Sequence, residues 1–245
     1  MSYHFNLSIS GMRFHVCSNH GAVIHMCGEK FLTPYPAVHS ISLSAEDIEI
    51  ERELCKREPE GIDPYLLSAP DHHIEAVCLL RKLADYIVDF DRILMHGSSI
   101  AVDGNGYIFT ALSGTGKSTH TKLLRELLGE RAVMVNDDKP FLHIKEDSVS
   151  VCGTPWMGKH RLGENLIVPL KGIFFLRRSE TNQLNRLNAD QALSLLLAQV
   201  HRPSDPDKMM KTLELLDRLL QIVPLYDFAC NMDPSAAELS SSVMG

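Results

Sequence analysis

A nine-residue stretch, Ala111-Leu-Ser-Gly-Thr-Gly-Lys-Ser-Thr119, constrains the fold of this chain more than any other part of its sequence. It matches the phosphate-binding pattern G-x-x-x-x-G-K-[ST], with Ala111 in the place of the first glycine. The apolar run 107–110 enters the stretch, and a helical pattern over 120–128 leaves it. A strand, a loop and a helix in this order place backbone N–H groups at a helix N-terminus, where they bind anions. The sequence therefore predicts an α/β core with a phosphate-binding loop.

The residue types in this loop suit a nucleoside triphosphate and its metal ion. Gly114 and Gly116 allow the backbone to turn so that successive N–H groups face phosphate oxygens. Lys117 is expected to neutralise the β- and γ-phosphates, and the hydroxyl of Ser118 is expected to hold Mg²⁺. We therefore expect ATP or a related nucleotide as ligand, with Mg²⁺ as cofactor.

The composition is that of an ordinary globular protein and argues against several classes of partner. Of the 245 residues, 44% are hydrophobic, and the net charge of −7 gives no general footprint for nucleic acid or an anionic membrane. No apolar stretch reaches the length of a membrane span, and the first residues lack the pattern of a secretory signal. The six cysteines are scattered without a C-x-x-C pair, which favours reduced thiols and a cytoplasmic location over zinc or disulfides.

Two parts of the chain are expected, a small N-terminal β subdomain over 1–70 and a core over 71–245. The first part contains short runs in which apolar and polar residues alternate, at Phe5–Ile9, Met12–Val16, Ala22–Ile24 and Ile48–Ile50. Such runs predict a mainly antiparallel sheet. Residues 55–70 carry charges and three prolines and are expected to form a surface connection. Asp71 is expected to cap a helix that reaches about Phe90.

The core is expected to hold a mixed sheet with a large antiparallel share. Two apolar runs, 98–102 and 107–111, flank the sequence Asp103-Gly-Asn-Gly106, which is a strong hairpin signal. Further strands are expected at 132–135, 141–144, 148–152 and 173–176. Helices are expected to begin at Asn188, at Asp205-Pro206 and at Asp233-Pro234. The fold class is therefore α/β, with too many antiparallel strands for a Rossmann-type sheet.

Paired carboxylates follow the strand that comes after the loop. Asp137 and Asp138 stand directly behind the apolar run 132–135 and Asn136, where phosphoryl transfer needs a metal ligand and a base beside the γ-phosphate. The alternative is a solvated turn, because Asp-Asp followed by Lys-Pro is good turn composition. His96 ends an apolar strand upstream, and a single histidine of this kind is more often structural than functional.

A basic turn follows the acids and contains the only tryptophan. Gly153 and Gly158 bracket Trp156, and Lys159-His-Arg161 follow at once. We expect this loop to border the nucleotide site and to become more ordered on binding, with Lys159 or Arg161 contacting the transferring phosphate or an acidic group on the acceptor. The alternative is a basic surface turn with Trp156 packed inward. Gln199 and Arg202 are expected either to reach phosphate or to serve as a helix cap.

The hairpin, the Leu-Ser-Gly-Thr-Gly-Lys-Ser loop and the Asp-Asp pair together resemble the HPr kinase/ATP-type phosphoenolpyruvate carboxykinase group. A His-Gly pair precedes the hairpin in HPr kinases, as His96-Gly97 does here. The chain is most similar to small HPr-kinase-like serine kinases, such as the lasso-peptide kinases, over about residues 92–232. The resemblance implies a P-loop kinase core. Thr119 stands where HPr kinases usually have an acidic residue, and the chain is about half the length of a carboxykinase. Both departures argue against those two activities as such.

The resemblance also implies roles for individual residues. Asp137 would take the proton from the acceptor hydroxyl, Asp138 would bind or orient the metal with Ser118, and His96 would lie beside the reacting groups. The base and metal roles of the two acids could be exchanged. Nucleotide contacts are expected from Ser113, Gly114, Thr115, Gly116, Lys117, Ser118 and Thr119, with Thr119 near the α-phosphate, and from Arg161.

The function that these observations favour is an ATP- and Mg²⁺-dependent kinase acting on a hydroxyl, above all a serine of a small protein or peptide. The first 70 residues would then shape acceptor docking, and a homo-oligomer is compatible with the sequence. A second hypothesis is a kinase of a small free metabolite. A third is a nucleotide-binding regulatory module without an acceptor of its own. A regulatory module needs Lys117 and Ser118, whereas a kinase also needs Asp137.

Overall fold

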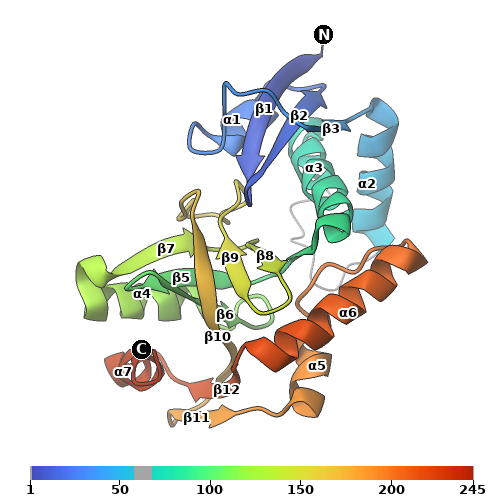
Figure 1. The fold of residues 1–245 in the computed structure, drawn as a ribbon. Helices are drawn as coiled ribbons and strands as arrows, with labels where there is room; N and C mark the ends of the chain where they lie inside the picture. Colours follow the sequence, from blue (N-terminus) through green and yellow to red (C-terminus); the bar gives the residue numbers. More distant parts are fainter. Residues whose placement is uncertain (1, 58–67, 245) are drawn as a thin grey trace. The chain divides into compact units, whose positions relative to one another are not determined.

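The computed structural model describes residues 2–57 and 68–244, and the chain divides into two compact units (Figure 1). One unit ends at Tyr86 and the other begins at Ile87. The predicted surface connection begins inside a helix at residues 55–57, and residues 58–67 lie outside the described part of the chain. A functional boundary at residue 70 stays a prediction. No helix in the described ranges is long and apolar enough to span a membrane.

In its described residues, the first unit combines a small sheet with three helices. Strands β1 (Tyr3–Ile9) and β2 (Met12–Ser18) are antiparallel, and β3 (His39–Ser42) lies parallel to β2. The helices are α1 (Ala22–Cys27), α2 (Ala45–Arg57) and α3 (Asp71–Ile87). The strands predicted at 5–9 and 12–16 and the long helix are confirmed, and a short 3₁₀ turn, Val88–Phe90, follows that helix in the second unit.

Two strand predictions in this unit are wrong. The runs 22–24 and 48–50 lie in helices α1 and α2, because three alternating residues also fit a helix that buries one side. In α2, Ile48 is buried and Ile50 is exposed. The start of α2 is fixed by a capping box: Ser44 Oγ accepts a hydrogen bond from Asp47 N at 3.1 Å, and the Asp47 carboxylate accepts one from Ser44 N at 2.8 Å.

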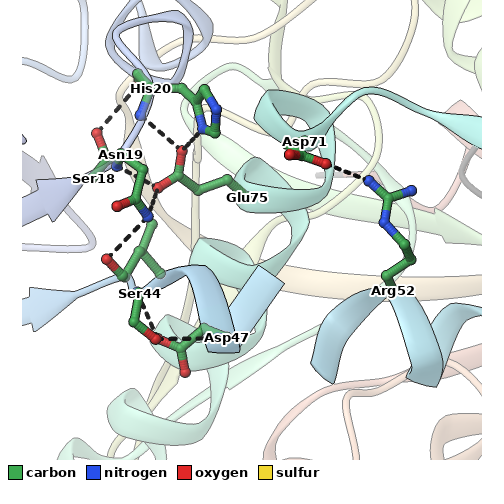
Figure 2. A network of polar contacts seen from close by, with 9 residues as sticks. Ser18, Asn19, His20, Ser44, Asp47, Arg52, Asp71 and Glu75 are labelled. Carbon is green, nitrogen blue, oxygen red and sulfur yellow. Dashed lines mark hydrogen bonds and ion pairs between the residues drawn. The ribbon is translucent and has the colours of Figure 1, made fainter. Parts of the chain in front are cut away.

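A buried carboxylate on α3 holds the turn that follows β2 (Figure 2). The Glu75 side chain is fully buried and accepts hydrogen bonds from the backbone N–H groups of Asn19 at 2.6 Å and His20 at 3.0 Å. Side-chain nitrogens of the same two residues lie within 3.0 Å of its oxygens. A buried charge is tolerated only with such a set of partners, so this network fixes α3 against the β2–α1 turn.

The second unit is built on a nine-stranded mixed sheet. Its strands are β4 (Arg92–Leu94), β5 (Ser98–Val102), β6 (Asn105–Thr110), β7 (Ala132–Asn136), β8 (Phe141–Ile144), β9 (Val149–Cys152), β10 (Ile167–Arg178), β11 (Gln183–Arg186) and β12 (Leu225–Cys230). The order is β4-β8-β9-β10-β6-β5-β7, with β12 beside β10 and β11 beside β12. The predicted α/β class with a mixed sheet is confirmed.

Strand β10 connects the parts of this sheet. Its first residues pair antiparallel with β9, residues 170–175 pair parallel with β6, and residues 173–178 pair parallel with β12. Side chains alternate between the two faces of a strand. Ile173 and Phe175 therefore lie in one buried cluster, and Phe174 and Leu176 lie in another. This explains why the run reads as continuously apolar in the sequence.

Helices complete both clusters. The helices are α4 (Lys117–Leu128), α5 (Ala189–Leu197), α6 (Pro206–Ile222) and α7 (Pro234–Ser241). Helices α5 and α6 contribute to the cluster of Ile173, whereas α4 and α7 contribute to that of Phe174 and pack against each other (Figure 1). The predicted starts are confirmed, and the side chains of Asn188 and Asp205 cap α5 and α6.

The predicted hairpin β5–β6 is also confirmed, and it leads directly into the loop at 111–116. Asp103 and Gly104 form its two-residue turn, both with positive φ. Strand β6 then ends at Thr110, and helix α4 begins at Lys117. The chain therefore reaches this loop from an antiparallel hairpin rather than from a crossover helix.

Candidate functional site

The loop between β6 and α4 has the strand–loop–helix arrangement that the sequence predicts. Gly114 has φ +77° and Gly116 has φ +126°, and residues other than glycine rarely adopt this backbone conformation. A Cβ atom at either position would meet nothing within 4 Å. Backbone conformation, and not lack of space, therefore requires glycine at both positions.

Hydrogen bonds hold the loop at several points. Lys117 Nζ donates to the carbonyl oxygen of Ala111 at 3.0 Å, and Thr115 N donates to that of Leu112 at 3.3 Å. The Lys117 side chain is nearly buried, and this burial lowers its pKa. The neighbouring carboxylates of Asp138 and Asp137 act in the opposite direction. The loop lysine therefore lies within electrostatic range of both acids.

The first acid of the pair is buried and fixed by a hydroxyl. Asp137 is 6% exposed, and its Oδ1 accepts a hydrogen bond from Ser98 Oγ at 2.6 Å. Ser98 Oγ also lies 3.0 Å from Thr121 Oγ1, in the second turn of α4. A solvated turn is therefore wrong for Asp137. The segment nonetheless forms a turn. Asn136 Oδ1 accepts hydrogen bonds from the backbone N–H groups of Asp138 and Lys139.

The second acid lies beside a histidine and a lysine. Asp138 Oδ1 is 3.4 Å from His96 Nε2 and 3.1 Å from Lys139 Nζ. Burial lowers the pKa of His96 to about 3, and the charges of Lys139 and Lys117 add to this effect while Asp138 opposes it. His96 is therefore neutral at pH 7. The structure thus brings together four residues that the sequence singled out (Lys117, Asp137, Asp138 and His96) and adds Lys139.

The backbone of His96 is tied to the entrance of the loop. Its N–H donates to the carbonyl of Gln199 at 2.7 Å, and its own carbonyl accepts from Thr110 Oγ1 at 2.7 Å. The side chain of Gln199 is buried, with Oε1 3.0 Å from the same Thr110 hydroxyl. Gln199 therefore supports the site from within the core, whereas Arg202 is exposed.

The base of the basic loop is bonded to the acid segment. Thr154 Oγ1 donates to the carbonyl of Lys139 at 2.7 Å, and Lys139 N donates to the carbonyl of Trp156 at 3.2 Å. A Cβ atom placed on Gly158 would lie 3.3 Å from Cβ of Asp138. The loop is therefore adjacent to the carboxylate pair, as the prediction that it borders the site requires.

The remaining residues of the predicted site differ in exposure. Trp156 and Ser118 are half-buried, whereas Ser113, Gly114, Thr119, Lys159, His160 and Arg161 are exposed. Arg161 has φ +50° and closes a turn in which its N–H donates to the carbonyl of Gly158 at 3.3 Å. The basic side chains therefore stand at the exposed tip of a loop whose base is fixed.

Sequence reasoning missed two cations at this site. Lys139 lies 3.1 Å from Asp138, although its place in the Asp-Asp-Lys-Pro sequence indicates only a turn. Arg178 follows the apolar run of β10, and its guanidinium donates to the carbonyls of Gly114 and Thr115. Its position in the sequence, far from the loop motif, gives no sign of that contact, whereas the Asp-Asp-Lys sequence at least places a cation next to the acids.

Oxygen donors of the kind that a magnesium ion takes are present at this site. Ser118, Asp137 and Asp138 offer hydroxyl and carboxylate oxygens, the ligands that Mg²⁺ prefers. Within residues 2–57 and 68–244, no group of three or more His, Cys, Asp or Glu side chains is arranged to hold a metal ion. Mg²⁺ at nucleotide sites uses one or two carboxylates together with phosphate oxygens and water, so the donor set matches that mode of binding.

Comparisons with known proteins give a structural likeness but no match in sequence. No protein-family model and no curated protein matches the chain. Among solved structures, the HPr(Ser) kinase/phosphatase from Coxiella burnetii matches with 11% identity and a TM-score of 0.36, over 61% of this chain and 87% of that chain. Similarity at this level assigns neither a family nor an activity, so the family resemblance stays a prediction.

Proposed function

We propose that this protein is an ATP- and Mg²⁺-dependent phosphotransferase that transfers the γ-phosphate to a hydroxyl, above all a serine of a small protein or peptide. The observation that carries the proposal is that Lys117 lies within electrostatic range of two carboxylates. Ser98 also connects one of them, Asp137, to helix α4 through Thr121. A phosphate-loop lysine, a buried acid and a half-buried acid are the groups that phosphoryl transfer requires, because its catalysis is mostly positioning and charge neutralisation.

Binding is assigned to the loop and the first turn of α4. The N–H groups around Gly116 and the positive end of the helix would hold the phosphates, and Lys117 would neutralise the β- and γ-phosphate oxygens. Ser118 and Asp138 would hold Mg²⁺. When bound, this ion neutralises charge that develops on the phosphate oxygens.

The chemical step is assigned to Asp137. Its carboxylate would accept the proton of the acceptor hydroxyl as the acceptor oxygen forms a bond to the γ-phosphorus, while the bond from that phosphorus to the β,γ-bridging oxygen breaks and ADP leaves. Ser98 occupies Oδ1 of this carboxylate, which leaves Oδ2 for the acceptor. His96, neutral at pH 7, would lie beside the reacting groups through its contact with Asp138.

The basic loop over residues 153–161 would contact the phosphate acceptor. Lys159, His160 and Arg161 are exposed at the tip of a loop bonded to the acid segment, so an acceptor that approaches Asp137 would meet positive charge. An acceptor with an acidic group near its hydroxyl fits this arrangement.

The proposal is tested by transfer of label from ATP. The protein is incubated with Mg²⁺, γ-labelled ATP and a pool of serine peptides with acidic, neutral or basic flanking residues, and phosphopeptides are identified by mass spectrometry. Acid-stable phosphoserine that is absent with Lys117→Ala supports the proposal. Nucleotide binding without transfer to any peptide or to a panel of metabolite alcohols, together with unchanged binding by Asp137→Asn, would point to the regulatory module instead.

A further inference from the structure

The guanidinium of Arg178 donates hydrogen bonds to two backbone carbonyl groups of the 111–116 loop. Nη2 donates to the carbonyl oxygen of Gly114 at 2.5 Å, and Nε donates to that of Thr115 at 3.4 Å. We propose that Arg178 is a positioning residue that fixes the direction of the loop N–H groups for phosphate binding. This inference rests on the function proposed above for the same loop.

The register of β10 places the arginine beside the loop. Strand β10 pairs with β6 up to Phe175 opposite Thr110, the last residue before the loop, and then continues for three more residues beside β12. Arg178 therefore stands beyond the end of β6, level with the loop. Its neighbour Arg177 points to the opposite face of the strand and pairs with Asp227 at 3.1 Å.

The planar peptide unit transmits this contact to the N–H groups. The carbonyl of one residue and the N–H of the next lie in one plane and point in opposite directions. A bond from Arg178 to the carbonyl of Gly114 therefore turns the N–H of Thr115 away from the guanidinium, and that N–H donates to Leu112 O. The bond to the carbonyl of Thr115 fixes the direction of the N–H of Gly116 in the same way.

The loop needs such a restraint because of its glycines. Gly114 and Gly116 both have positive φ and open space around the Cβ position, so the peptide units beside them rotate easily unless they are bonded. Lys117 restrains the first residue of the loop, Ala111, from the helix side. Arg178 adds a second bond to the Gly114–Thr115 peptide unit, whose N–H donates to Leu112 O, and bonds the Thr115–Gly116 unit through its carbonyl.

The proposed role of Arg178 requires a guanidinium and not only a positive charge. A guanidinium is a planar fork whose donors reach two acceptors at once, whereas a lysine ammonium is a point charge on a flexible chain. Arg178→Lys keeps the charge near the loop and loses the two-point contact. Arg178→Met loses both and keeps much of the apolar stem. Arg177→Met removes an equal charge from the adjacent position and is the matched control.

The first measurement needs no nucleotide. Amide hydrogen exchange of Thr115 and Gly116, followed by NMR, should be about tenfold faster in Arg178→Met than in the wild type, in line with the loss of a charge-assisted hydrogen bond. Arg178→Lys should also exchange faster, and Arg177→Met should exchange like the wild type. Because Arg178 is exposed, the unfolding midpoint should stay unchanged. Equal exchange in all four proteins, or in wild type and Arg178→Lys, overturns the inference.

The second measurement separates this inference from the proposed function. Calorimetry with Mg-ATP and with Mg-tripolyphosphate, which lacks the base and the ribose, should show an equal loss of about tenfold for both ligands in Arg178→Met. A loss of the same size in Arg177→Met would reduce the effect to net charge and overturn the inference. A wild type that binds neither ligand would refute the proposed function, while the exchange result would still decide whether Arg178 holds the loop.

Discussion

Ser98 donates a 2.6 Å hydrogen bond from Oγ to Oδ1 of Asp137, and the same hydroxyl contacts Thr121 on helix α4, which follows the 111–116 loop. The buried acid is thereby connected to helix α4 through two hydroxyl groups. The geometry of the acid and that of the loop are set by the same short chain of hydrogen bonds, which makes Ser98 a positioning residue for Asp137.

Ser98→Ala should lower turnover while leaving the KM for ATP nearly unchanged, because the acid loses its orientation and the phosphate contacts remain. It should also destabilise the fold by about 1–3 kcal/mol, the cost of an unmade buried hydrogen bond. Ser99→Ala is the matched control, since Ser99 is equally buried and its hydroxyl donates to the carbonyl of Asn136 instead. Steady-state kinetics and urea unfolding check both variants. Equal losses of turnover in the two variants would contradict the special role of Ser98.

Substitutions of the two acids should have different effects. Asp137→Asn should fold and bind nucleotide yet lose phosphoryl transfer by two or more orders of magnitude, in line with general-base contributions of roughly 10²–10⁴. Asp138→Asn should instead weaken the Mg²⁺ dependence of nucleotide binding, because it removes the carboxylate proposed as an oxygen ligand of the ion. Titration of binding and rate against Mg²⁺ distinguishes them. The reverse pattern would exchange the two roles, and unaltered transfer in both variants would remove the acids from the mechanism.

Protonation of a buried histidine should destabilise the second unit in acid. Burial lowers the pKa of His120 to about 4, between the rings of Phe109 and Phe228, and its Nδ1 has no hydrogen-bond partner among the described residues. The pKa in the unfolded chain is about 6.5, so the native state binds fewer protons there. The stability due to neutral His120 is therefore complete above pH 6.5 and falls as the pH drops from 6.5 towards 4.

Urea unfolding at several pH values tests this expectation. The free energy of unfolding of the wild type should fall more steeply between pH 6.5 and 4.5 than that of His120→Gln. Some slope should remain in the variant, because burial also lowers the pKa of His96 to about 3 and of His143 to about 4. Parallel curves for the two proteins would contradict the assignment to His120.

The single tryptophan reports on the basic loop. Trp156 is half-buried, and its carbonyl accepts a hydrogen bond from Lys139 N, so its emission should change when Mg-ATP reaches the acid pair. Arg161→Ala should lower turnover through loss of positive charge at the loop tip, whereas Lys171→Ala, which removes an exposed charge from β10, should not. Unchanged emission together with full activity of Arg161→Ala would make the loop purely structural.

Local signals in the sequence account for most of the second unit. The Asp-Gly turn, the glycines of the loop and the caps at Asn188 and Asp205 act over a few residues, and each appears where it was predicted. In the first unit, three-residue alternations at 22–24 and 48–50 were too short to separate a strand from a helix. The Ser44–Asp47 capping box is the local signal that marks the start of α2.

Contacts between residues far apart in the chain could not be predicted from local sequence patterns. Arg178 reaches the loop only because β10 runs parallel to β6 and extends beyond it, a pairing across more than sixty residues of chain that no local pattern encodes. The meeting of His96 with Asp138 depends in the same way on the packing of separate strands. The residue types were readable from the sequence, whereas their mutual distances required the sheet order.

Calorimetric titration with Mg-ATP tests the central claim most directly. The wild type should bind with measurable heat, and Lys117→Ala should remove or strongly weaken that binding, because it deletes the cation proposed to neutralise the β- and γ-phosphates. Lys122→Ala is the control, an exposed lysine on the same helix whose ammonium lies 3.7 Å from Glu126, and it should bind like the wild type. Absence of binding in the wild type, or equal binding by Lys117→Ala, would contradict the account.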